Sequence, residues 1–176
     1  KSDMVATGQK YMDQQNMFDF RLISTYGWDA DDLKDIRALE EIADAEGVVY
    51  QDLIVQVNDE TTESVYRFYV LPEQINTVVL RGGRMPQADN ECVIDGYHMD
   101  DSILGTTLTI TEGNTSDSLE SMKNRTFTVV GYVSSPLYMD LNRGTTSVGN
   151  GSLSNYVMVL PQAIDVDYYT EIVITI

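Results

Sequence analysis

Apolar and polar residues alternate with two different periods in the first third of the chain. Residues 18–26 alternate one by one, which is typical of a half-buried strand. Apolar residues then recur at helical spacing between Asp29, a favourable N-cap, and Gly47, a residue type that commonly ends helices. A second strand follows at 48–57. The pattern therefore predicts a β-α-β unit whose helix covers 30–46.

Beyond this unit the chain reads as short strands separated by turn residues. The predicted strands lie at 64–71, 76–81, 91–95, 107–111, 126–133, 156–160 and 168–176. A short helix is expected around 97–104, and a helical turn after Pro161. The polar stretch 114–123 and the stretch 134–155, which contains several glycines, are expected to be loops. Strands and helices in this arrangement predict the α+β fold class.

The two ends of the chain suggest a piece of a longer protein. Apolar side chains recur at helical spacing near the start and predict a helix over 3–15, with Met4, Val5, Gly8, Tyr11 and Met12 on one face. The chain begins at Lys1 without an initiator methionine and ends inside the strand-like run 168–176. No apolar run approaches the roughly 20 residues that a membrane-spanning helix requires.

Composition excludes one class of partner. The chain has 28 acidic and 11 basic residues, a net charge of −17, and its basic residues form no cluster. Such a chain repels phosphate backbones, so we expect no binding to nucleic acid. Hydrophobic residues make up 43% of the chain, enough for a packed core. Cys92 is the only cysteine, so no intramolecular disulfide can form.

Two candidate chemical sites are better explained as structure. Cys92 lies in an apolar strand pattern, where a buried and unreactive thiol is the common outcome, and we expect no contact with His98. His98 is the only histidine, so a second imidazole is not available for a metal site. We therefore expect no catalytic residue, no metal and no cofactor. Without a phosphate loop, the chain is also expected neither to bind nor to hydrolyse ATP.

An acidic run has a superficial likeness to a calcium loop. Asp29, Asp31 and Glu40 stand at the first, third and twelfth positions of such a loop. However, the fifth position is Leu33 and the sixth, which should be glycine, is Lys34. The helical apolar stripe through the same residues explains them better, so a calcium site is not expected.

One polar segment is a candidate contact loop. It is rich in glycine, but no Gly-Lys-Ser/Thr sequence follows and it does not join a strand to a helix, so it is no phosphate loop. The segment is either an ordered turn or a loop that contacts a partner, because long loops on a rigid scaffold often carry contacts. The residues concerned are Arg143, Gly144, Thr145, Thr146, Ser147, Gly149, Asn150 and Gly151.

Four short motifs follow one another in the middle of the chain. They are VLRGGRMP at 79–86, NECVID at 90–95, LGTTLTI at 104–110 and FTVVGYV at 127–133. Their order resembles the extracytoplasmic, MacB-like periplasmic core domain of MacB/FtsX-like ABC-transporter permeases. The segments 135–138, 143–147 and 167–172 are similar to the large permeases of this kind in Firmicutes.

The resemblance implies an architecture. A stalk at 1–17 would follow a transmembrane helix of the same permease. A porter-like β-α-β lobe, with a split β-α-β sheet, would take 18–63 and 134–176. A β-rich lobe would be inserted at 64–133.

The resemblance also implies a function without catalysis. The domain would stand on the extracellular face of the cell membrane, contact a peptide, lipoprotein or envelope substrate or a partner, and relay motion by mechanotransmission. A separate cytoplasmic ATPase subunit would hydrolyse ATP, and the permease would work as a dimer. Two alternatives remain: a secreted or surface-anchored module that binds glycan or protein, and an enzyme without a recognisable site.

The apolar run at the end of the chain predicts one feature of the topology. Leaving the side chains of 168–176 in water would forfeit about 1.5 to 3 kcal/mol for each one that could be buried. In a split β-α-β sheet the strands at 18–25 and 48–57 run parallel with a gap between them. We expect 168–176 to fill that gap, antiparallel to both neighbours, and the strand at 18–25 to form an open edge.

Overall fold

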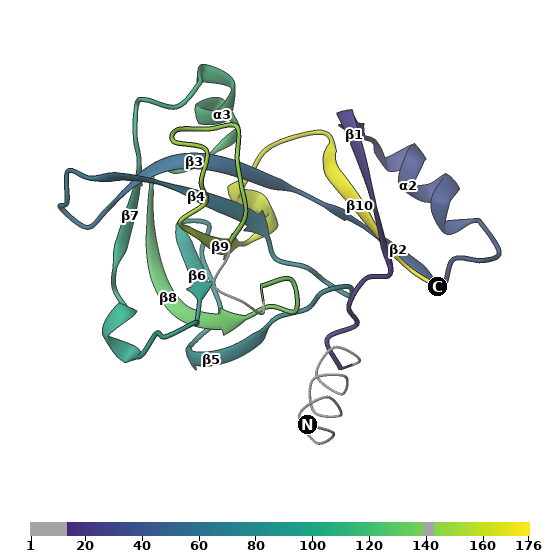
Figure 1. The fold of residues 1–176 in the computed structure, drawn as a ribbon, viewed down its shortest axis with the longest axis horizontal. Coiled ribbons are helices and arrows are strands. Elements are labelled where there is room, and N and C mark those ends of the chain that lie inside the picture. Colours follow the sequence, from purple (N-terminus) through teal and green to yellow (C-terminus); the bar gives the residue numbers. More distant parts are fainter. Residues whose placement is uncertain (1–13, 139–142) are drawn as a thin grey trace.

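A computed structural model describes residues 14–138 and 143–176 of the protein (Figure 1). Most of the predicted helix at 3–15 and of the stalk at 1–17 lies outside the described residues. None of the helices in the described ranges is both long and apolar enough to cross a membrane. The fold is α+β, as the sequence predicts, and consists of two sheets that lie side by side.

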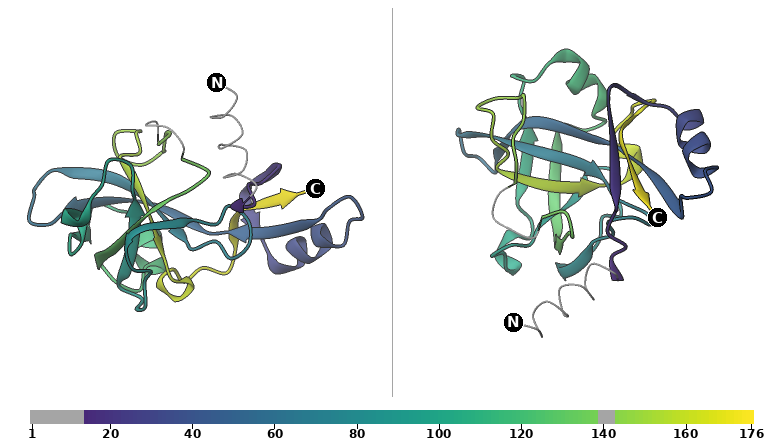
Figure 2. Two further views of the ribbon diagram at one scale, coloured as in Figure 1. Left: turned by 90° about the horizontal axis from the view of Figure 1, so that it is seen from below. Right: turned by 45° about the vertical axis from the view of Figure 1, so that its right-hand side comes forward.

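The small sheet has three strands, in the order β1 (Phe20–Trp28), β10 (Tyr169–Thr175) and β2 (Asp44–Val48). β10 is antiparallel to both neighbours, so β1 and β2 are parallel with β10 between them. The apolar C-terminal run thus lies beside β1, antiparallel to two parallel neighbours, as predicted, but its second neighbour is 44–48 and not the predicted strand at 48–57. The helix α2 (Ala30–Arg37) packs on the small sheet through Leu33, which contacts Ala45 and Ile172. In Figures 1 and 2, α2 lies on the side away from the large sheet.

The large sheet contains the other seven strands. They are β3 (Tyr50–Val57), β4 (Glu63–Val70), β5 (Val79–Gly83), β6 (Glu91–Asp95), β7 (Thr107–Ile110), β8 (Thr126–Ser134) and β9 (Asn155–Val159). The order is β5-β8-β6-β9-β4-β3-β7, and β7 also pairs with the first half of β8. Six strands therefore form a closed sheet, and β5 pairs with the second half of β8.

The main core fills the inside of this closed sheet. Each of the six strands contributes two alternate buried side chains, as the period of a strand requires. These residues are Leu53, Val55, Tyr66, Phe68, Cys92, Ile94, Leu108, Ile110, Phe127, Val129, Val157 and Val159. Met122 and Ile164, which form an isolated bridge, pack against the same core.

Two predictions about the β-α-β unit are wrong. The helix ends at Arg37 rather than at 46. The strand expected at 48–57 corresponds to β3, which belongs to the large sheet, and the second parallel strand of the small sheet is β2 at 44–48, mostly within the range predicted as helix. Gly47 does not end a helix but lies within β2, where the ring of Tyr169 crosses it. A Cβ on Gly47 would lie 2.3 Å from the Cδ1 atom of Tyr169. This close approach, which no local pattern reveals, explains the glycine.

The stretch 114–123 also differs from the prediction, because part of it is a helix. α3 (Ser116–Ser121) begins at an N-cap, Thr115, whose hydroxyl accepts a hydrogen bond from the Ser118 N–H. The expected helix around 97–104 is reduced to the 3-10 turn η1 (Asp101–Ile103), whereas the expected turn after Leu160 is present as η2 (Pro161–Ala163). Short polar helices of this kind have little apolar periodicity for a sequence pattern to reveal.

The sheets do not divide the chain where the predicted lobes do. The strands of the large sheet run from Tyr50 to Val159, whereas the predicted inserted lobe covers 64–133. The difference arises because β3 and β9 pair with β4 in the large sheet. Only residue 49 separates β2 from β3, so the chain passes directly from one sheet to the other.

Candidate contact site between the two sheets

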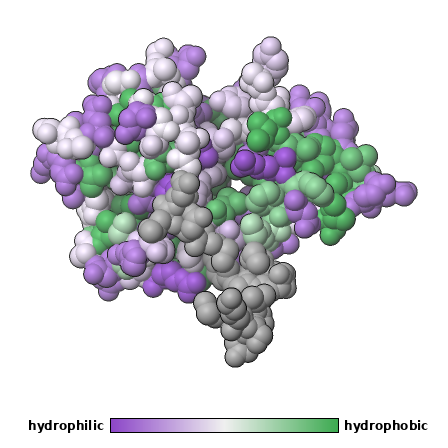
Figure 3. Space-filling model, in the orientation of Figure 1, coloured by the Kyte–Doolittle hydropathy of each residue, from purple (hydrophilic) through white to green (hydrophobic). Residues whose placement is uncertain are grey.

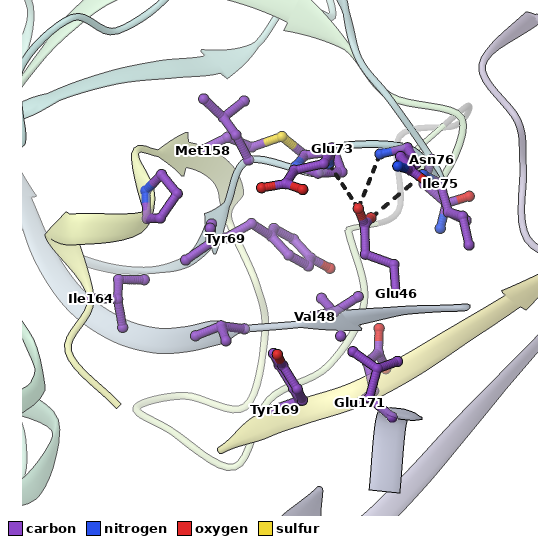
Figure 4. Close-up of a pocket in the computed structure, with 18 of the residues that line it drawn as sticks. Glu46, Val48, Tyr69, Glu73, Ile75, Asn76, Met158, Ile164, Tyr169 and Glu171 are labelled. Carbon is purple, nitrogen blue, oxygen red and sulfur yellow. Dashed lines mark hydrogen bonds between the residues drawn. The ribbon is translucent and has the colours of Figure 1, made fainter. Parts of the chain in front are cut away.

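A cavity of about 460 Å³ lies where the two sheets meet (Figure 4). Val48 on β2 and Tyr169 on β10 form its wall on the small sheet, and Tyr69 and Met158 form its wall on the large sheet. Further apolar side chains come from the connections: Val49, Leu71, Pro72, Leu137, Pro161, Ile164 and Val166. Charged and polar side chains, among them Arg37, Glu46 and Glu171, complete the lining, so the cavity combines apolar walls with polar groups, as small-molecule sites in proteins often do.

Glu46 ties the small sheet to the segment that leaves β4. Its Oε1 atom accepts hydrogen bonds from the N–H groups of Glu73 and Gln74, both at 3.0 Å, and its Oε2 atom accepts one from Ile75 at 3.4 Å. Figure 4 shows these bonds at the cavity. Burial raises the pKa of Glu46, and the three N–H groups partly oppose that rise.

The same segment holds the beginning of the described chain. The Asn76 N–H donates to the Asn16 carbonyl at 3.0 Å, and the Thr77 N–H donates to the Gln15 carbonyl at 3.1 Å. The Asn76 side chain, which is buried, accepts a hydrogen bond from the Phe18 N–H at 2.9 Å. Residues 71–77 thus connect the chain before β1, the small sheet and the large sheet.

A second hollow, of about 840 Å³, shares Tyr69, Leu137 and Glu171 with the first. Figure 3 shows the surface hollowed between the two sheets, with hydrophobic side chains gathered over the small sheet. Tyrosine and arginine side chains are prominent in its wall. Arg67 donates to Asp52 through two bonds, of 2.7 and 3.0 Å, and its guanidinium lies 4.1 Å from the centre of the Tyr50 ring.

The tyrosines of this hollow contact one another. The Tyr69 and Tyr138 hydroxyls lie 2.6 Å apart, and the Tyr138 ring stacks on Tyr156 with centroids 4.3 Å apart. Burial raises the pKa of Tyr69 well above its ordinary value, and the neighbouring Tyr138 adds to this rise. Tyr69 therefore keeps its hydroxyl proton at neutral pH and acts as a packed hydrogen-bonding group.

The candidate contact loop begins inside this cluster. Arg143 is buried and forms an ion pair with Asp95, and its guanidinium lies within 6 Å of the ring centres of three tyrosines. Thr146 donates from its hydroxyl to Asp52 at 2.7 Å, and Thr145 bridges to Ser152. Gly144, Ser147, Gly149 and Asn150 are exposed, and Gly151 is half-buried. The structure therefore shows an ordered turn with an exposed tip.

Cys92 and His98 lie in different environments. Cys92 is buried inside the closed sheet, and burial raises the pKa of its thiol far above the ordinary value. His98 is exposed, and its ring packs against Tyr97 with centroids 4.2 Å apart. The predicted burial of Cys92 is confirmed, and a thiol of this kind does not act as a nucleophile.

The acidic run at 29–40 has a structural explanation. Asp29 caps α2, and a capping box joins it to Asp32: each side chain accepts a hydrogen bond from the backbone N–H of the other, at 2.8 and 2.9 Å. Nowhere in 14–138 or 143–176 do three or more His, Cys, Asp or Glu side chains form a group suited to a metal ion.

The sequence motifs meet in one structural cluster. Arg84, from the first motif, donates two hydrogen bonds to Glu91, from the second, at 2.9 and 2.5 Å. Gly131, from the fourth, packs so closely that a Cβ there would lie 2.2 Å from the Arg84 carbonyl oxygen. Gly83 has φ +71°, a conformation that favours glycine. The first, second and fourth motifs therefore specify how β5, β6 and β8 join.

Comparison with known proteins identifies relatives by structure only. No protein-family model matches the sequence, and no curated protein matches it. One similar solved structure is the extracellular domain of the noncanonic ABC-type transporter YknZ from Gram-positive bacteria. Its identity is 8% and its TM-score 0.46, with 89% of this chain and 80% of that chain covered.

Two further structures are similar. The periplasmic region of MacB from Actinobacillus actinomycetemcomitans has 13% identity and a TM-score of 0.47, with 85% of this chain and 64% of that one covered. A domain from a protein described as a permease, from Porphyromonas gingivalis, has 14% identity and a TM-score of 0.43, with 82% and 60% covered. The chain spans less than two thirds of the last two structures.

Sequence reasoning did not find the cavity. Glu46 was placed in a helix, and Glu171 and Tyr69 carried no signal beyond strand alternation. The hint in the sequence is a glutamate directly before the apolar run at 172–174 of β10, where charged residues are rarely buried without a partner.

Proposed function

We propose that this chain is an extracytoplasmic domain of a MacB/FtsX-like ABC-transporter permease, which contacts a substrate or partner between its two sheets and relays motion. The observation that carries the proposal is the connection at 71–77. It bonds to the chain before β1 through Asn76 and to the small sheet through Glu46, and it continues directly from β4. The order of the four motifs supports the same class of protein.

The arrangement suits a relay because the two sheets have separate cores. Ala45 and Ile172 belong to the core of the small sheet, whereas Phe68 and Phe127 belong to that of the closed sheet. Few covalent connections join them, of which residue 49 is the shortest. Two bodies with their own cores and a hollow between them can change their relative position without unfolding.

The proposal assigns partners by class. The transmembrane helices of the same permease would precede β1, and a cytoplasmic ATPase subunit would supply the energy. The permease would be dimeric and stand in the cell membrane, with this domain on its extracellular side. The domain itself would not be an enzyme. The exposed tip of the loop at 143–151 would be a further contact for a peptide, lipoprotein or envelope substrate.

A cross-link across the connection tests the relay. In the complete transporter, Glu46→Cys with Gln74→Cys places two cysteines where a side chain now bonds to a backbone N–H at 3.0 Å. Oxidation is expected to abolish substrate-stimulated ATP hydrolysis, and reduction to restore it to the level of the single variant Glu46→Cys, which also lacks the carboxylate. The matched control is Thr107→Cys with Thr128→Cys, which joins facing residues of β7 and β8 inside the closed sheet. Full stimulation in the oxidised junction pair would refute the relay.

A surface-anchored module that binds glycan or protein is the second candidate. Tyr26, Tyr97 and Tyr168 are 94%, 41% and 41% exposed, and exposed tyrosines are frequent in such binding sites. The two functions differ in one measurement. A binding module still binds its ligand when it is separated from any transporter. Oxidation of the Glu46→Cys, Gln74→Cys pair would leave that binding unchanged.

A further inference from the structure

Glu171 is a buried carboxylate whose charge is poorly matched by its surroundings. It lies in the middle strand of the small sheet, and its side chain is 8% exposed. Among the described residues its one ion-pair partner is Arg21, at 3.8 Å, which is longer than a hydrogen bond. The Arg21 side chain is 53% exposed. A buried carboxylate without a hydrogen bond is unfavourable, and burial raises the pKa of Glu171 accordingly.

The other carboxylates of the 460 Å³ cavity differ from Glu171. Both oxygens of Glu46 already accept backbone hydrogen bonds, and Glu73 is exposed at the edge. Arg37 is the basic residue among the lining residues, and its Nε atom donates to the Ala45 carbonyl at 2.8 Å. Figure 4 draws the three glutamates around one space with apolar side chains between them. The cavity therefore has an excess of negative charge.

Arg67 is the second cation near Glu171, and it is already occupied. Its guanidinium bonds to both oxygens of Asp52 and covers the Tyr50 ring. Its influence lowers the pKa of Glu171, but less than burial raises it. Neither Arg21 nor Arg67 donates a hydrogen bond to Glu171. An acceptor thus faces the cavity with the capacity to bind a donor of positive charge.

We propose that the cavity binds a small apolar molecule that carries one primary ammonium group. The ammonium would donate to Glu171, and the apolar part would lie against Val48, Leu71 and Met158. The volume of about 460 Å³ lies within the range of roughly 300 to 1,000 Å³ that is usual for small-molecule sites. The net charge of −17 attracts such a cation over a longer range. The inference rests on the proposed function only in treating this cavity as a contact site.

Calorimetric titration of the chain with n-hexylammonium at neutral pH tests the inference. Hexylammonium is expected to bind, whereas hexanol and hexanoate, which share its alkyl chain, bind at least about tenfold more weakly, since a charged hydrogen bond is lost. Glu171→Gln should weaken hexylammonium binding roughly tenfold or more. The matched control, Glu112→Gln, removes an exposed carboxylate outside the cavity lining and should leave binding within about twofold. Equal binding of all three probes, or no effect of Glu171→Gln, would overturn the proposal.

Two further measurements keep the test decisive. If Glu171→Gln does not fold, the unchanged chain is titrated with hexylammonium at a series of pH values from 7.5 down to 4. Hexylammonium binding must weaken as Glu171 takes up a proton, and constant affinity would contradict the site.

A lysine side chain offers the same chemistry. The blocked tripeptide Leu-Lys-Leu, compared with Leu-norleucine-Leu, shows whether the source is a peptide or a free amine. If hexylammonium binds but the oxidised cross-link leaves ATP hydrolysis unchanged, the relay is refuted and this site stands. If hexylammonium does not bind but the cross-link abolishes stimulated ATP hydrolysis, this site is refuted and the relay stands.

Discussion

The two sheets differ in how completely they bury their own apolar residues. The closed sheet surrounds its core with six strands, and its inward residues are 9% exposed or less. The small sheet has one short helix on one face, and β1 is an open edge. Large exposed hydrophobic side chains are concentrated around it: Phe20, Ile23, Tyr26, Leu39, Tyr168 and Ile176. The comparison indicates that the closed sheet is stable through its own core, whereas the small sheet depends more on contacts with its surroundings.

The first prediction concerns the two cores. Phe68→Ala should cost about 3 to 5 kcal/mol of the free energy of unfolding, because Phe68 is fully buried and packs edge-to-face on Phe127. Ile172→Ala, in the small sheet, should instead speed amide hydrogen exchange in β1, β2 and β10 and leave the closed sheet protected. Denaturant unfolding and hydrogen exchange measure the two effects. Loss of protection in both sheets after Ile172→Ala would show that they unfold as one unit.

The second prediction compares two glycines. Gly131→Ala should destabilise by about 1 to 3 kcal/mol, because the new Cβ would lie 2.2 Å from the Arg84 carbonyl oxygen, a backbone atom that cannot move alone. Gly47→Ala should cost less, since its obstacle is the ring of Tyr169, which can rotate. Gly113→Ala is the control, as the nearest atom would lie at 3.5 Å. Thermal unfolding would contradict the account if Gly47→Ala were the more harmful change.

The third prediction is that acid acts in opposite directions on the two regions. Hydrogen bonds from Arg84 lower the pKa of Glu91 from 4.5 to about 2, so its contribution is present above pH 4.5 and is lost as the pH falls toward 2. The pKa of Glu171 is raised above 4.5, so the folded state takes up a proton first and its stability rises as the pH falls toward 4.5.

Two variants separate these effects. Glu91→Gln should remove part of the loss of stability between pH 4.5 and 2, and Glu171→Gln should remove part of the gain above pH 4.5. Hydrogen exchange of each sheet across this pH range provides the measurement. Parallel responses of the two sheets would mean that the assigned carboxylates do not control them.

The sequence predicted local elements better than their partners. Alternation located most strands and, with the apolar run at the end, placed β10 beside β1 and between two parallel strands, but the second of these is β2 at 44–48 and not the predicted strand at 48–57. It did not predict the parallel pairing of β4 with β9, because pairing between distant segments depends on the whole core. The helix was predicted too long because Gly47 serves the Tyr169 ring and not a helix end. The cavity was missed because Glu46 and Glu171 acquire their roles only when distant segments meet.

Distance measurement between the two sheets tests the central claim most directly. Spin labels at Asp35→Cys, exposed on α2, and Asp59→Cys, exposed beside β3, report the separation of the sheets in the complete transporter. Cys92 is buried and does not interfere. The control pair, Asp59→Cys with Asp117→Cys, lies within the large-sheet region. The account predicts that the first distance distribution shifts between nucleotide-free and ATP-bound states while the second stays constant. Unchanged distributions for both pairs in a transporter that hydrolyses ATP would contradict it.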